Sequence, residues 1–188
     1  MYREALILAS KSPRRKELLE RMGVPFEVME ADLEETEQGD PQRVVLGNAL
    51  GKARAVRARF PERFILGADT VVCLDGQVFG KPRDRDDARR MLSALSGRWH
   101  EVFTGVALLT PEKTLTSLGR TRVHFVSVRE EEIERYILSG EPFDKAGAYA
   151  IQGMAGMWID RIEGSFSNVI GLPQSVVRDL LIQADYNL

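Results

Sequence analysis

Cysteine and histidine are almost absent from this 188-residue chain. The single cysteine, Cys73, has no partner with which to form an intrachain disulfide, and its apolar surroundings are typical of a small core residue rather than a nucleophile. The only two histidines, His100 and His124, exclude a histidine-rich metal site. The HExxH and GxSxG motifs are missing as well. The chain therefore fits a reducing compartment and has no histidine cluster for catalysis.

Long hydrophobic runs and a strong charge of one sign are lacking too. The apolar run at residues 5–9 is far shorter than a signal or membrane-spanning segment, and no later run is long enough. The net charge of −2 gives no general attraction to nucleic acid, and the cations are dispersed among acids without interleaved aromatic rings. We therefore predict a cytoplasmic protein that binds neither membrane nor nucleic acid. The length suits a single domain over residues 1–188, with room for two lobes.

Strand and helix patterns alternate along the chain, without internal repeats or low-complexity linkers. This order predicts an α/β fold with one long, twisted, mixed sheet and helices packed against it. The expected strands are residues 5–9, 25–29, 64–67 with an extended continuation to 74, 77–80, 99–109, 114–128 and 157–162. One expected helix begins at residue 13, and four further helices are expected over residues 40–60, 84–96, 130–138 and 173–184.

A basic turn follows the first expected strand. Ser12 and Pro13 are typical of a helix N-cap and first helical position, and the next residues are Arg14, Arg15 and Lys16. Cations are unfavourable there for an isolated helix, because its N-terminus already carries positive partial charge. Together with the Ser10 hydroxyl, the turn is a plausible receptor for a polyanion such as phosphate. The alternative is a solvated basic face, and Lys11 and Lys16 keep that interpretation.

Asp69 follows an apolar strand within Gly67-Ala-Asp-Thr70. Ligands of open α/β sheets lie in crevices at strand ends, so this carboxylate is a candidate catalytic or metal-binding acid. Taken alone, a turn aspartate that caps local amides explains it about equally well.

Further charged residues point to phosphate chemistry. Residues 76–82 resemble a phosphate-binding P-loop but are one residue too short between the glycines, and Pro82 replaces the required Ser or Thr, so a Walker A motif is rejected. Lys81 can still reach a phosphate as a point charge, as can Lys52, although an isolated lysine is more often solvated. The acidic residues 32–35 are either a solvated loop or oxygen ligands for a magnesium ion shared with substrate phosphates. These residue types indicate phosphate ester chemistry but identify neither the base nor the bond cleaved.

Taken together, the chain resembles the Maf family of nucleoside triphosphate pyrophosphatases. The matching blocks run in order over nearly the whole chain: Ala9-Ser-Lys-Ser-Pro-Arg-Arg15, residues 32–35, Lys52-Ala53, Gly67-Ala-Asp-Thr-Val-Val72, Gly80-Lys-Pro-Arg-Asp84, residues 95–106, residues 140–153 and residues 164–173. The resemblance implies an elongated fold related to inosine triphosphatases, with an active-site cleft between two lobes. It also implies hydrolysis of a nucleoside triphosphate to monophosphate and pyrophosphate with Mg²⁺ or Mn²⁺, commonly by a homodimer.

The resemblance also assigns roles to residues. Asp69 would be the proton acceptor for the attacking water, and Glu35 would hold the metal together with Asp69. The expected triphosphate-binding residues are Ser10, Arg14, Arg15, Lys52 and Lys81. Arg14, Thr70 and Gln152 resemble the dTTP- and UTP-specific members, and the Gln152 amide can pair with an imide edge.

Two alternatives remain at this point. The 7-methyl-GTP members of the family tend to carry an aromatic residue near the Arg14 position and to lack a run like Asp144-Lys-Ala-Gly-Ala-Tyr149. A non-catalytic, nucleotide-sensing regulator of septum formation would keep the cations, but it would have no need of Asp69 and Glu35. Because both acids are present, the sequence favours an enzyme over a regulator, and the resemblance of Arg14, Thr70 and Gln152 favours the dTTP/UTP type over the 7-methyl-GTP type.

Overall fold

The computed structural model describes residues 4–188. The strands are β1 (Leu6–Leu8), β2 (Phe26–Val28), β3 (Ile65–Leu74), β4 (Gln77–Phe79), β5 (Trp99–Leu109), β6 (Thr114–Phe125) and β7 (Ile159–Glu163). The α-helices are α1 (Pro13–Arg21), α2 (Pro41–Arg57), α3 (Arg85–Leu95), α4 (Glu130–Leu138), α5 (Phe166–Ile170) and α6 (Gln174–Gln183). Three 3₁₀ turns lie between α4 and β7: η1 (Glu141–Asp144), η2 (Ala146–Ala148) and η3 (Met154–Trp158).

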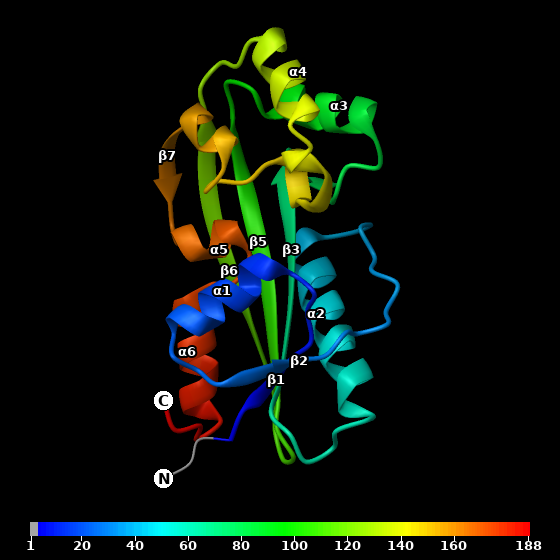
Figure 1. The fold of residues 1–188 in the computed structure, drawn as a ribbon, viewed down its shortest axis with the longest axis vertical. Coiled ribbons are helices and arrows are strands. Elements are labelled where there is room, and N and C mark those ends of the chain that lie inside the picture. Colours follow the sequence, from blue (N-terminus) through cyan, green and yellow to red (C-terminus); the bar gives the residue numbers. More distant parts are fainter. Residues whose placement is uncertain (1–3) are drawn as a thin grey trace.

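The strands form one mixed sheet in the order β2-β1-β3-β5-β6-β7, and β4 also pairs with β3. The pairs β1–β2 and β1–β3 are parallel, whereas the pairs that link β3, β4, β5, β6 and β7 are antiparallel. Long strands give the molecule its elongated shape, with helices on both faces of the sheet (Figure 1). The predicted mixed α/β fold is confirmed.

The edge of β3 that faces away from β5 is shared by two short strands. β1 pairs with β3 at Ile65 and Leu66, and β4 pairs with it from Val72 to Leu74. Between them, residues 67–71 of β3 have a strand partner only on the β5 side within the part of the chain that the structure describes. Such a split in an α/β sheet leaves room beside the strand for a ligand. Asp69 lies at the centre of this split.

Alternation along the strands separates two apolar layers in the half of the molecule that holds both termini. Leu66 and Ala68 face the layer under α1 and α6, whereas Ile65 faces the layer under α2. Side chains alternate between the faces of a strand, so Asp69 faces α2 and Thr70 faces the opposite layer. In the other half, α3, α4 and the 3₁₀ turns pack against the far ends of β3, β5 and β6 in a separate core. The half with the two layers is called the first lobe and the half with the separate core the second lobe, and the long strands run through both (Figure 1).

Several predicted boundaries were wrong by a few residues. The second helix ends at Arg57 rather than residue 60, because Pro61 disfavours a helical residue before it. β6 ends at Phe125 rather than residue 128, because Val126 bonds to Trp158 and Val128 to Ser96 after a bulge. β7 begins at Ile159, since the two residues before it belong to a 3₁₀ turn.

Asp69 itself is placed differently from the prediction. It does not end a strand but lies in the middle of the ten-residue β3, and the strand that ends beside it is β1. Within residues 4–188, no helix is both long and apolar enough to cross a membrane.

Candidate active site

Close helix packing places two side chains of α2 over Asp69. A Cβ atom on Gly67 would overlap the carbonyl oxygen of Ala49, and one on Gly105 would overlap the backbone of Val45. These two glycines therefore let α2 approach the centre of β3 and β5 more closely than any larger residue would allow. Residues 48 and 52 are four apart on the helix, so both point at the same spot on the sheet.

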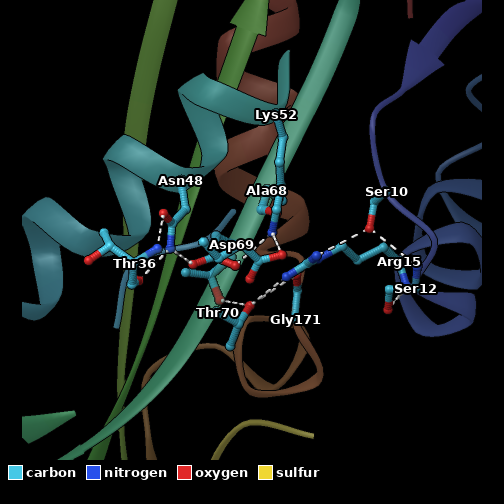
Figure 2. Close-up of polar contacts among 12 residues, drawn as sticks. Ser10, Ser12, Arg15, Thr36, Asn48, Lys52, Ala68, Asp69, Thr70 and Gly171 are labelled. Carbon is cyan, nitrogen blue, oxygen red and sulfur yellow. Dashed lines mark hydrogen bonds and ion pairs between the residues drawn. The ribbon is translucent and has the colours of Figure 1, made fainter. Parts of the chain in front are cut away.

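The Asp69 carboxylate is buried and held at both oxygens. The Lys52 Nζ atom lies 2.8 Å from Oδ1, and the Asn48 Nδ2 atom donates to Oδ2 at 2.9 Å (Figure 2). Asp69 is 5 % exposed and Lys52 8 % exposed. The same Lys52 ammonium also pairs with Glu35, at 2.9 Å from its Oε1 atom. Each carboxylate oxygen can accept two hydrogen bonds, so Asp69 keeps capacity for a further donor such as water.

Arg15 approaches from the other face of the sheet. Its Nε atom donates to the carbonyl oxygen of Gly171 at 2.8 Å, and its two terminal nitrogens donate to Ser10 Oγ at 3.2 Å and Thr70 Oγ1 at 3.1 Å (Figure 2). Thr70 Oγ1 lies 2.9 Å from Thr104 Oγ1. The three acceptors of the Arg15 hydrogen bonds lie in three different segments of the chain, so together they fix the plane of the guanidinium.

Burial lowers the pKa of the Arg15 guanidinium from its ordinary value, and the nearby carboxylates of Asp69 and Glu35 oppose that shift. Because an arginine starts from a very high pKa, it stays charged at neutral pH. Thus a positive group and a negative group face each other across β3.

The basic turn at the start of α1 has the local structure predicted for it. Ser12 is the N-cap, its hydroxyl accepts from the Arg15 backbone N–H at 3.4 Å, and the first turn contains no acidic residue. Lys11 pairs with Glu30 at 2.7 Å, and both side chains are exposed. This exposed pair supports the solvated interpretation of Lys11.

Arg14 connects the two lobes across the cleft. Its guanidinium donates to the Asp144 carboxylate at 2.8 Å and to the Asp144 carbonyl oxygen at 3.1 Å. Burial alone would raise the pKa of Asp144, but hydrogen bonds from Lys145 and Arg14 lower it to about 2. The pair is therefore an ion pair at neutral pH, and Arg14 is held over the cleft.

Most of these groups line one cleft of about 320 Å³. It contains every site residue predicted from the sequence: Ser10, Arg14, Arg15, Glu35, Lys52, Asp69, Thr70, Lys81 and Gln152. Six basic and four acidic side chains line it, an excess of two positive charges in a chain of net charge −2. The cleft is thus locally suited to a polyanion.

Known proteins resemble this chain over nearly its whole length. The family model described as Maf-like protein matches residues 5–184. The chain belongs to the Maf family. It is 48 % identical over 178 residues to a dTTP/UTP pyrophosphatase of Bacillus cereus, an alignment that covers 93 % of each chain. Proteins of the same name from Dictyoglomus thermophilum and Bacillus cytotoxicus are 47 % and 50 % identical and cover 99 % and 93 % of each chain. A crystal structure of a Vibrio cholerae protein aligns over both whole chains with a TM-score of 0.48 and 12 % identity.

Several cleft residues of this Maf-family chain escaped the sequence analysis. Asn48, Glu37, Lys145 and Tyr149 all line the cleft. The helical spacing of residues 48 and 52 could have indicated Asn48, once Lys52 was a candidate. Lys145 and Tyr149 belong to the run that the resemblance links to specificity, but no local pattern indicated that they line the cleft, because the fold brings residues 145–152 there from the other lobe.

The backbone of residues 145–149 is unusual in this Maf-family chain. Gly147 and Ala148 both have positive φ angles, 67° and 62°, and the Gly147 N–H donates to the Gly80 carbonyl oxygen at 3.0 Å. A Cβ on Gly147 would also lie only 2.6 Å from a Val72 methyl carbon. A left-handed alanine is strained, and such strain is typical of functional sites. The tight turn docks this segment, with its cleft-lining Lys145 and Tyr149, against β3 and Gly80.

The carboxylates fit a hard divalent cation that shares a phosphate ligand. Asp69 and Glu35 both contact Lys52 Nζ, so their oxygens converge on one region. No cluster of three or more Asp, Glu, His or Cys side chains suited to a metal occurs among residues 4–188. Magnesium needs only one or two carboxylates when phosphates supply other ligands. The donor set of this Maf-family chain therefore suits a metal that arrives with a phosphorylated substrate.

Proposed function

We propose that this chain is a nucleoside triphosphate pyrophosphatase that hydrolyses dTTP and UTP to the monophosphate and pyrophosphate. The observation that carries the proposal is the buried Asp69 carboxylate, held by two donors and opposed across β3 by the charged Arg15. The names of the relatives support the same activity.

In the proposed reaction, Asp69 acts on water. Its carboxylate accepts a proton from a water molecule while the water oxygen forms a bond to the α-phosphorus. The bond between the α-phosphorus and its bridging oxygen to the β-phosphate breaks, and pyrophosphate leaves with that oxygen. The Lys52 and Asn48 contacts orient the carboxylate so that its unused lone pairs face the cleft.

Cations on both sides of the cleft would bind the triphosphate. Arg15 has five N–H groups, and after its three hydrogen bonds each terminal nitrogen retains one N–H for a phosphate oxygen. Lys81 is exposed, lines the cleft, and forms no hydrogen bond or ion pair with other residues in the described range. It is therefore available to the leaving pyrophosphate as a positive charge.

A divalent cation, Mg²⁺ or Mn²⁺, belongs to this proposal. Asp69 and Glu35 would hold it, and it would supply Lewis-acid stabilisation of charge on the phosphates. Glu35 is exposed and makes a single ion pair, so it can turn from Lys52 to a metal at little cost. Removal of metal with EDTA should abolish hydrolysis, and Mg²⁺ or Mn²⁺ should restore it. Full activity in EDTA would remove the metal from the proposal.

Base selection would fall to the residues of the cleft that come from the second lobe and from α1. Gln152 is exposed in the cleft, and its amide offers a donor and an acceptor to the imide edge that uracil and thymine share. Arg14 is fixed by Asp144 above the same cleft, and Thr70 acts through its bond to Arg15.

A panel of nucleoside triphosphates tests the proposal. With Mg²⁺, dTTP and UTP should release pyrophosphate with a higher kcat/KM than dATP, GTP, CTP or 7-methyl-GTP. A preference for 7-methyl-GTP would place the chain in the other specificity class. No pyrophosphate from any of the six nucleotides would contradict the activity itself.

A further inference from the structure

The side chain of Asn48 lies buried between Asp69 and the irregular segment that precedes α2. Its Nδ2 atom donates to Asp69 Oδ2 at 2.9 Å and to the Thr36 carbonyl oxygen at 2.8 Å. Its Oδ1 atom accepts from the Thr36 backbone N–H at 3.1 Å. The residue is 5 % exposed. Both amide hydrogens and the amide oxygen of Asn48 are thus used inside the protein (Figure 2).

These partners allow only one orientation of the amide. Thr36 N–H must meet an oxygen, and the Thr36 carbonyl and the Asp69 carboxylate must both meet the nitrogen. If the amide were turned by 180°, its NH₂ group would face the Thr36 N–H, and its oxygen would face the Thr36 carbonyl oxygen and the Asp69 carboxylate. Such a fully satisfied buried group is rigid, and it holds its partners rigidly.

Asn48 holds the irregular segment that carries Glu35. Residues 29–38 have no regular secondary structure, and most of their side chains are exposed. Two polar contacts hold residues 35 and 36 next to Asp69: the Glu35–Lys52 ion pair and the paired backbone bonds of Thr36 to Asn48. The ion pair involves an exposed carboxylate, so the two buried-side bonds to Asn48 are the stronger tie.

From this geometry we propose that Asn48 is a positioning residue for the hydrolysis. It orients the Asp69 carboxylate and fixes the Glu35 segment at a set distance from it, and it acts through its hydrogen bonds to Asp69 and Thr36. This role rests on the proposed function, because it acts through the base and the candidate metal ligand. It explains why a polar amide is buried on the inner face of α2, where Val45 and Ala49 beside it are apolar.

Three variants separate this role from a general effect on folding. Asn48→Leu removes every amide contact. Asn48→Asp keeps an acceptor for Thr36 N–H but has no donor for Asp69. Gly47→Ala is the matched control, because a Cβ there meets nothing within 4 Å and alanine favours the helix more than glycine does. The double variant Gly47→Ala/Asn48→Leu combines the control with the loss of the amide.

The measurements are kcat, KM and the hydrogen-exchange rate of the Thr36 amide. Asn48→Leu should lower kcat by about 10- to 100-fold, the usual effect of losing an outer-shell partner, with little change in KM. It should also speed exchange at Thr36 by about tenfold, the equivalent of one hydrogen bond. Asn48→Asp should lower kcat similarly while Thr36 stays protected. Gly47→Ala should match the parent, and the double variant should stay as slow as Asn48→Leu.

Several results would overturn the role of Asn48. Parental kcat in Asn48→Leu or Asn48→Asp would do so, and so would recovery of kcat in the stabilised double variant, which would mark a purely structural effect. If Asn48→Leu does not fold, Asn48→Asp decides. If the unmodified protein hydrolyses no nucleotide, the proposed function fails separately. Unchanged Thr36 exchange in Asn48→Leu would then show that Asn48 does not hold the Glu35 segment either.

Discussion

At the scale of single residues, the site depends on side chains whose shape matters as much as their charge. Arg15 reaches Gly171, Ser10 and Thr70 with three different nitrogens. A lysine carries the same charge but has a single nitrogen and cannot span these partners. Arg15→Lys should therefore reduce kcat/KM for dTTP by about 10- to 100-fold, an effect we would measure by pyrophosphate release. The control is Arg21→Lys, because Arg21 on the same helix pairs with Glu17 at the surface and has no other side-chain partner among residues 4–188. Equal effects of the two changes would contradict a special role for Arg15.

Asp69 is the residue whose replacement should separate chemistry from binding. Asp69→Asn keeps the volume and loses the proton acceptor, so kcat should fall by about 10²- to 10⁴-fold. Titration calorimetry with a non-hydrolysable dTTP analogue should still detect binding, because the cations of the cleft remain. Substantial turnover in this variant would show that another group accepts the proton.

At the scale of elements, the close approach of α2 to the sheet is the feature that brings Asn48 and Lys52 to Asp69. Gly105→Ala would push a Cβ into the backbone of Val45, which cannot yield as a flexible side chain can. We expect a loss of about 1–3 kcal/mol in the free energy of unfolding, measured by urea denaturation. Gly47→Ala, a change on α2 at a position where a Cβ meets nothing within 4 Å, should be neutral or stabilising. Similar stabilities for the two variants would argue against tight packing of α2.

Sequence patterns predicted the existence of the helices and strands better than the residues at which they begin and end. Alternation, N-caps and Gly or Pro signals located all of the long strands and helices, because these signals act locally. Predicted ends that depend on tertiary hydrogen bonds were wrong. An example is the end of β6, after which the backbone bonds to Trp158 and to the Ser96 side chain instead of to a strand. The same limit explains the site. Asp69 was a candidate because of its place beside an apolar strand, and the family resemblance added Lys52, but Asn48 became visible only when α2 was placed over β3.

At the scale of the whole molecule, a buried histidine in the second lobe links stability to pH. His100 is 2 % exposed, and its Nε2 atom lies 2.8 Å from the Tyr149 hydroxyl. Burial lowers the pKa of His100 to about 3 from an ordinary value of 6.5. Between pH 6.5 and about 3, the unfolded chain therefore binds a proton at His100 that the folded protein does not bind. Stability from this group is complete above pH 6.5 and is lost as pH falls toward 3.

This effect predicts a pH-dependent stability that one substitution removes. His100 should contribute a fall of about 1.4 kcal/mol in the free energy of unfolding for each pH unit below its unfolded pKa. Urea denaturation at pH 7, 6 and 5 measures the slope. His100→Gln should be less stable at pH 7, because it disturbs the packing, but its stability should depend less on pH. An unchanged slope would contradict the assignment.

The arrangement of the two lobes lay beyond local sequence patterns. The expectation of a cleft came from the family resemblance, and the structure adds what joins its sides: the Arg14–Asp144 ion pair and the turn at residues 145–149. Ion pairs between residues 130 positions apart leave no local signal, because many other acids in the chain have equal charge. The homodimer expected from the resemblance stays a prediction.

Hydrolysis of dTTP in water enriched with ¹⁸O reveals which phosphorus atom the water attacks. If Asp69 activates water for attack at the α-phosphorus, the products are dTMP and pyrophosphate, and mass spectrometry should find one ¹⁸O atom in dTMP and none in pyrophosphate. Label in pyrophosphate would place the attack at the β-phosphorus. Release of dTDP and labelled phosphate would show cleavage at the γ-phosphorus, and either result would contradict the proposed reaction.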